Sequence, residues 1–210
     1  MVEDAVMKSV KALRDNNLER SRLILENDVY INRKRYEIEL FIIMLIARQQ
    51  PAARDLRTLA ASLDICTELE RIGDYAKGIS NINIRSGGLG FPGILKDLYS
   101  KGQKSVDMLN RAMTSYAEDG FQTAQGIIQE DDLIDECYTR LYHDAVNNIL
   151  ENARNIERAN HVVWAAHNLE RMGDRVTNIC ERVIYMVTGK IPASFIMTGQ
   201  LKPLPQESQE

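Results

Sequence analysis

The hexapeptide LERIGD at residues 69–74 returns as LERMGD at residues 169–174, 100 positions further along the chain. Each copy contains a glycine, and a glycine inside a helix costs about 1 kcal/mol relative to alanine. Because this costly residue occupies the same place in two nearly identical segments, the pattern indicates an internal repeat. The repeat restricts the fold to two copies of one unit, in which the glycine has a structural or functional role.

Apolar residues recur at helical spacing through most of the chain, and very little of the sequence resembles a strand. The first half contains three helical stretches, at about residues 2–13, 19–49 and 51–84, and the second half contains three more. A shift of 103 positions aligns the first stretch with the fourth, but residues 94–103 then have no counterpart before Met1. The sequence therefore predicts an all-α protein of two tandem three-helix bundles, with a shorter first helix in the first bundle.

Turn residues mark the expected boundaries between these helices. Pro51 follows the second stretch and is placed as the first residue of the third helix, a position where proline is favoured. A glycine-rich segment separates the two halves, and its G-x-G-x-x-G pattern is not a dinucleotide site because it follows a helix rather than a strand. The expected organisation is a first bundle at residues 1–84, a linker at 85–93, a second bundle at 94–190 and a loose tail at 191–210.

Acidic side chains occur four residues apart on several of these helices, which places both members of each pair on one helix face. In an antiparallel hairpin, residues at equal distances from the turn lie side by side. Asp28 and Asp74 are equally far along the sequence from residue 51, where the turn is predicted. The same symmetry holds in the second half, so each hairpin should gather carboxylates from two helices. The predicted sets are Asp28, Glu70 and Asp74 beside Asn32 in the first bundle, and Asp131, Asp135, Glu170 and Asp174 in the second.

Crowded carboxylates repel one another, so the pKa of some of them should be raised and a cation should offset their charge. Oxygen-only ligand sets suit hard cations such as magnesium, calcium, manganese or ferric iron, and zinc is less expected because it prefers nitrogen and sulfur. Gly73 and Gly173 would let a neighbouring backbone or a ligand approach closely. A single Glu-x-x-x-Asp pair is usually a solvated helix face, but two facing pairs in each half favour a metal site. No catalytic residue and no organic cofactor site is predicted.

Charge and hydropathy limit the class of protein. The chain has 26 basic and 30 acidic residues, a net charge of −4, which argues against nucleic acid as a partner. The longest apolar run, residues 40–47, is far shorter than the ~18 residues that a membrane helix requires. The acidic start of the chain does not resemble a signal peptide. We therefore expect a cytoplasmic protein.

The segments ENDVYIN, IARQQPAARDLR and LERIGD in the first half, and EDDLID and LERMGD in the second, closely resemble the PhoU family of phosphate-uptake regulators. The resemblance covers the chain from near Met1 to about Ile191 and implies tandem three-helix bundles with acidic motifs that bind iron, zinc, magnesium or manganese. Those motifs fall on the seven carboxylates given above. Asn32 stands where the family usually has aspartate, which implies a weaker first site, and relatives have further turns of the first helix before the position of Met1.

The resemblance also implies a function. By this resemblance the protein would be an adaptor that links the phosphate-specific ABC transporter at the inner membrane to a phosphate-sensing histidine kinase. It would favour repression of the phosphate-starvation response when phosphate is plentiful. The protein would then be a regulator and not an enzyme, touching the membrane only through its partners. The alternatives are a metal-dependent all-α hydrolase, whose Glu-x-x-Glu and Glu-x-x-Asp motifs are absent from these helices, and a metal storage protein. A homodimer stays open, because no residue pattern specifies one.

Overall fold

The computed structural model describes residues 1–190, except for the side chains of residues 131–138, 140, 148, 149, 151 and 153. The chain forms α1 (Val2–Arg14), α2 (Leu18–Gln49), α3 (Ala53–Ser86), α4 (Pro92–Ala117), α5 (Phe121–Glu151) and α6 (Ile156–Thr188). A short 3-10 helix, η1 (Ala153–Asn155), precedes α6, and residues 1–190 contain no strand. The predicted fold class, an all-α protein of two tandem three-helix bundles, is confirmed. The predicted tail, residues 191–210, lies outside the described residues.

The helix boundaries follow from the turn residues, with one exception. Asn17 caps α2, because its side-chain oxygen accepts a hydrogen bond of 2.9 Å from a backbone N–H of the first turn. Gln50 ends α2 in the left-handed conformation, with φ of 46°. Pro51 lies two residues before Ala53, where α3 begins, so the prediction that it starts this helix was wrong. Ala52 is extended, with φ of −116° and ψ of 159°, so the chain between the left-handed end of α2 and the start of α3 is not helical.

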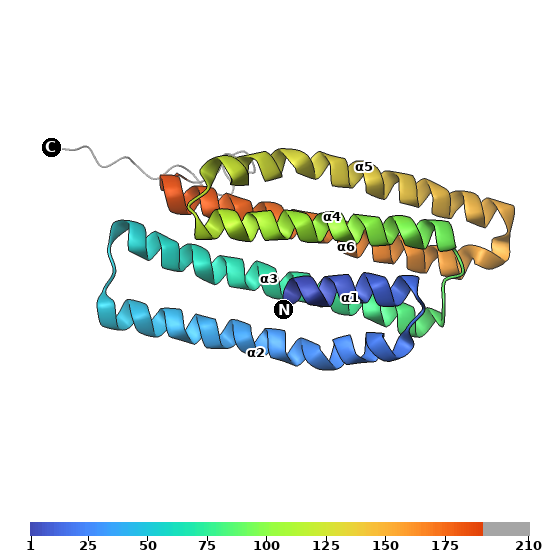
Figure 1. Ribbon diagram of the computed structural model, residues 1–210, viewed down its shortest axis with the longest axis horizontal. Coiled ribbons are helices and arrows are strands. Elements are labelled where there is room, and N and C mark those ends of the chain that lie inside the picture. Colours follow the sequence, from blue (N-terminus) through green and yellow to red (C-terminus); the bar gives the residue numbers. More distant parts are fainter. Residues whose placement is uncertain (191–210) are drawn as a thin grey trace.

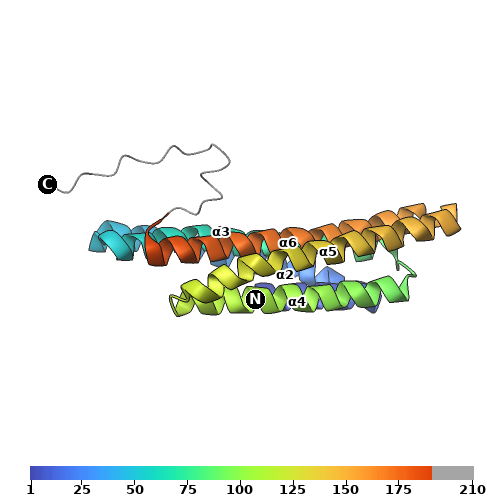
Figure 2. The same cartoon turned by 90° about the horizontal axis from the view of Figure 1, so that it is seen from above.

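The helices are arranged so that equivalent elements of the two repeats pack on each other. α3 and α6 run in opposite directions along the middle of the molecule, and the α2–α3 and α5–α6 hairpins point toward opposite ends (Figure 1). α1 and α4 lie side by side against one face of this central pair (Figure 2). α5 starts beside the end of α4 and rises to lie along α6. The two repeats are thus related by an approximate twofold rotation.

One hydrophobic core runs through both bundles. It includes Ile72 and Ile79 of α3 and their repeat counterparts Met172 and Ile179 of α6, all of which are 0% or 1% exposed. Leu109 of α4 joins the same cluster. These positions belong to the apolar stripes read from the sequence, so the helical spacing identified the buried faces of α3 and α6.

The two repeats differ in the length of their first helix. α1 has 13 residues and α4 has 26, as the missing counterpart of residues 94–103 predicted. None of the helices within residues 1–190 combines the length and the apolar character needed to cross a bilayer.

Candidate functional site

The contact between Ile31 of α2 and Gly73 of α3 sets how closely the first hairpin packs. A Cβ atom at Gly73 would lie 3.2 Å from Ile31 Cδ1 and 3.3 Å from its Cγ2, so the glycine makes room for this buried side chain. This explains the glycine of the first hexapeptide by close helix packing. Gly173 is buried in α6, and its role stays a prediction.

The structure brings together the carboxylates of Asp28, Glu70 and Asp74, which we call the first acidic set. Asp74 is an exposed residue, but partial desolvation raises the pKa of its carboxyl group, and the negative charge of Asp28 raises it further. Burial likewise raises the pKa of Glu70, and the charges of Asp74 and Asp28 add to that effect. Mutual repulsion therefore acts within the set as expected, although loss of hydration contributes more to both pKa shifts.

Asp28 is the most enclosed member of the first acidic set and already has two partners. Its side chain is 8% exposed, and its Oδ2 atom accepts a hydrogen bond of 2.7 Å from Lys77 Nζ on α3. The Asn32 amide donates a second hydrogen bond to the same oxygen, at 3.1 Å. Hydrogen bonding to Asp28, followed by the charges of Asp28, Asp74 and Glu70, raises the pKa of the Lys77 ammonium group. The sequence pattern drew attention to Asn32 but missed Lys77.

The second acidic set, predicted as Asp131, Asp135, Glu170 and Asp174, is described only in part. Asp131 and Asp135 belong to α5, but their side chains lie outside the described residues. In α6, Glu170 and Asp174 are partly exposed. His167 Nδ1 lies 3.0 Å from Glu170 Oε2, and this neighbour was not among the predicted residues of the set. Its spacing of three residues from Glu170 was the available signal, because such residues share a helix face.

The first acidic set does not present a ready metal centre. Among the side chains that the structure describes, no three carboxylate, imidazole or thiol groups converge closely enough to hold one ion. In the first bundle the innermost carboxylate oxygen, Asp28 Oδ2, is held by Lys77 and Asn32 instead. Metal binding by either set stays a prediction.

A polar seam joins α3 to α6. Glu68 is 9% exposed, and its Oε1 atom accepts a hydrogen bond from Arg71 at 2.9 Å. Its Oε2 atom accepts hydrogen bonds from Arg175 at 3.3 Å and Asn178 at 3.2 Å, both on α6. None of these contacts was predictable from the sequence, because α3 and α6 are far apart in the chain.

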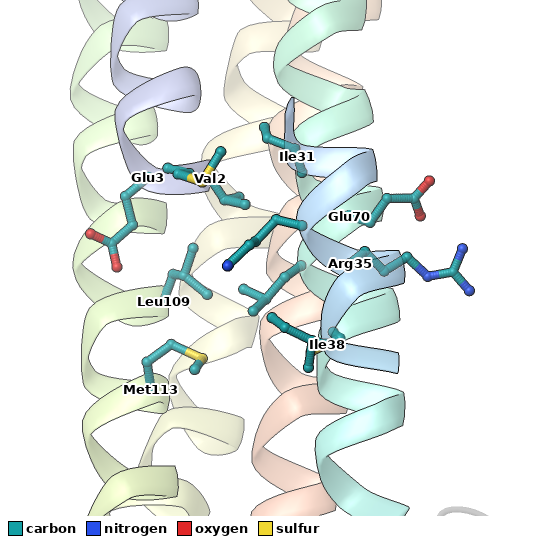
Figure 3. Close-up of a pocket in the computed structure, with 12 residues that line it drawn as sticks. Val2, Glu3, Ile31, Arg35, Ile38, Glu70, Leu109 and Met113 are labelled. Atoms are coloured by element: carbon teal, nitrogen blue, oxygen red, sulfur yellow. The ribbon is translucent and has the colours of Figure 1, made fainter. Parts of the chain in front are cut away.

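An apolar pocket of about 380 Å³ opens beside the first turn of α1. Ile31, Ile38, Leu109 and Met113 line it from α2 and α4, as Figure 3 shows. The carboxylate of Glu70 lies at its edge and points away from its middle. Glu70 therefore borders both the pocket and the first acidic set, but its carboxylate is not directed into the pocket.

Replacing Gly73 with leucine should lower the free energy of unfolding by about 2 kcal/mol, the typical cost of overpacking a filled site. The loss is expected although leucine favours a helix over glycine by roughly 0.8 kcal/mol. The physical reason is the 3.2 Å approach of the Ile31 side chain to the position of a Cβ atom. Urea unfolding followed by circular dichroism measures the change.

Gly126 of α5 provides the matched control, because a Cβ atom there would have nothing within 4 Å. Gly126→Leu should leave the free energy of unfolding unchanged or raise it slightly. An Ile31→Ala background should reduce the cost of Gly73→Leu. Equal effects of the two leucine substitutions would contradict this explanation of the glycine.

Comparison with known proteins identifies the family. The PhoU domain matches residues 1–82 and 99–183, once over each bundle. Over 191 residues the chain is 32% identical to the phosphate-specific transport system accessory protein PhoU homolog of Clostridium acetobutylicum, covering 90% of this chain and 87% of that protein. It is 33% identical over 193 residues to the homolog of the same description from Rhizobium meliloti, covering 91% and 81%.

Solved structures agree with this match. The crystal structure of PhoU from Pseudomonas aeruginosa superposes with a TM-score of 0.84 at 32% identity, covering 90% of this chain and 91% of that one. The phosphate transport system regulatory protein PhoU from Streptococcus pneumoniae gives a TM-score of 0.82 at 28% identity, covering 91% and 90%. With the domain matched in both repeats and the same fold over nearly the whole described chain, this chain belongs to the PhoU family.

Proposed function

We propose that this protein is a cytoplasmic regulator of phosphate uptake that acts as an adaptor and not as an enzyme. The observation that supports the proposal is the PhoU match over both bundles, together with relatives named as accessory proteins of the phosphate-specific transport system. In this role the chain contacts components of the phosphate ABC transporter and a phosphate-sensing histidine kinase. It favours repression of the phosphate-starvation response when phosphate is plentiful.

The two acidic sets are the candidate sites for hard cations, with iron, magnesium or manganese as the expected ions, and the second set is the one proposed to hold them. The second set has four carboxylates and the first has three, and a larger ligand charge gives tighter binding of such ions. The ion would offset the mutual repulsion of the carboxylates and order the surface around the set for docking. Zinc is less favoured by oxygen ligands, although His167 beside Glu170 offers one nitrogen.

The regulatory role is tested by affinity capture of the transporter and kinase components with the purified chain. We expect both to be retained by the wild-type chain and less of them by Asp131→Ala, because that substitution removes a proposed ligand of the second set. Failure to retain either component in the presence of manganese would contradict the adaptor role. A nucleotide hydrolysis assay with magnesium or manganese covers the enzyme alternative, since turnover that Asp174→Ala abolishes would refute the adaptor role.

Elemental analysis of the purified variants tests the metal proposal. Asp131→Ala should remove more bound metal than Asp28→Ala, because the second set carries the larger negative charge. Equal losses from the two variants would contradict a stronger second site.

A further inference from the structure

The first acidic set contains a cation that belongs to the chain itself. Lys77 Nζ lies 2.7 Å from Asp28 Oδ2, and the Asp28 side chain is 8% exposed while that of Lys77 is 42% exposed. The lysine thus reaches inward from a solvent-accessible stem to an enclosed carboxylate. An enclosed carboxylate without a partner is costly, so this contact contributes to the stability of the hairpin.

The two repeats differ at the position of this lysine. The hexapeptides align with an offset of 100 residues, which pairs Lys77 with Thr177. The Thr177 hydroxyl donates a hydrogen bond of 2.8 Å to the Asp174 carbonyl of its own helix and brings no charge. The second helices align with an offset of 103, which pairs Asn32 with Asp135. The first set therefore has three carboxylates and an ammonium group, where the second has four carboxylates and a hydroxyl.

We propose that the ammonium group of Lys77 is the resident cation of the first acidic set, and that the first bundle is for this reason independent of metal. Asn32 completes the arrangement, because its amide donates to Asp28 Oδ2 where a fourth carboxylate would repel it. Any response to metal is then confined to the second bundle. That metal acts on the second bundle rests on the metal binding proposed for it. The assignment of Lys77 as the cation of the first set does not.

A lysine and a metal ion are alternatives at this site for a simple reason. Both neutralise the same Asp28 oxygen, and an ion that enters must first displace an ammonium group that is covalently attached to the neighbouring helix. The ammonium group is present at every metal concentration, so the first hairpin stays packed when metal is scarce. A divalent ion gains less from a set whose charge is already partly neutralised.

The test uses the full chain with Lys77→Thr, which copies the second repeat, and Lys77→Arg, which keeps the positive charge. Without metal, Lys77→Thr should lower the apparent melting temperature by about 3 °C or more, and Lys77→Arg should change it much less. Manganese alone should restore the melting temperature of Lys77→Thr. Titration with Mn²⁺, read from the electron paramagnetic resonance of the free ion, should show one more bound ion in Lys77→Thr/Asn32→Asp than in the wild type.

The reciprocal variant Thr177→Lys keeps the proposal testable if the first-bundle variants do not fold. It should weaken Mn²⁺ binding to the second set about tenfold or more. The inference is overturned if metal-free Lys77→Thr melts as the wild type does, if the double variant gains no Mn²⁺, or if Thr177→Lys binds Mn²⁺ unchanged. A wild type that binds no Mn²⁺ at all, combined with a destabilised Lys77→Thr that gains an ion, would support the inference and refute the proposed metal site of the second bundle.

Discussion

Asn83→Ala should lower the free energy of unfolding by about 3 kcal/mol, because it removes the hydrogen bonds of a buried amide and leaves a cavity in its place. Asn83 is 0% exposed, and its amide donates to the Ala12 carbonyl at 3.0 Å and to Ser21 Oγ at 2.9 Å. A third, longer contact of 3.4 Å reaches the Asn17 carbonyl. One side chain of α3 thus donates hydrogen bonds to the last turn of α1, to the turn between α1 and α2, and to the first turn of α2.

Chemical denaturation of Asn83→Ala measures this effect, and Asn81→Ala on the same helix is the control for losing an asparagine at a partly exposed position. Asn83→Asp keeps the shape but cannot donate from a charged carboxylate, so it should destabilise the protein at least as much. A loss below about 1 kcal/mol for Asn83→Ala would contradict the role given to this amide.

Glu68→Leu should lower the free energy of unfolding by about 2–3 kcal/mol, because it removes the acceptor shared across the polar seam between α3 and α6. Arg175, whose side chain is 19% exposed, would keep its charge without the Glu68 carboxylate that now faces it at 3.3 Å. Removing one partner of an enclosed ion pair costs more than the pair contributes, since the other charge stays partly desolvated. Thermal and urea unfolding both report the change.

Asp64 on the same helix gives a matched control. Its carboxylate lies 3.2 Å from Arg182 of α6, but its side chain is 52% exposed. Asp64→Leu should therefore cost only about 0–1 kcal/mol. In a Glu68→Leu chain, Arg175→Leu should recover part of the loss, and equal losses from Glu68→Leu and Asp64→Leu would show that burial of the seam does not matter.

The helices and the register of the first hairpin could be predicted from sequence because both follow from regular geometry. The apolar spacing identified the buried face of α3, including Ile72 and Ile79. Equal distance from the turn predicted that Asp28 lies beside Asp74. After desolvation, the charge of Asp28 is the next cause that raises the pKa of Asp74, as that arrangement requires. Antiparallel helices keep the same rise per residue, so a turn position fixes which residues face each other.

The partners of the carboxylates were not predictable in the same way. Lys77 reaches Asp28 along a flexible side chain with many rotamers, and its position in the sequence does not specify which carboxylate it will meet. Glu68 finds Arg175 only because α3 packs on α6, and no local pattern encodes that contact. Pro51 was misplaced because helix starts depend on the conformation of the residues before them, here the left-handed Gln50.

Because α3 packs on α6 and α1 packs on α4, each repeat depends on the other to cover part of its apolar surface. A polypeptide with a single repeat would expose to solvent the apolar side chains of its first and third helices that now contact the other repeat. A half-length polypeptide could cover these surfaces only by pairing with a second copy of itself. Duplication within one chain then turns an association that depends on concentration into one that is built in.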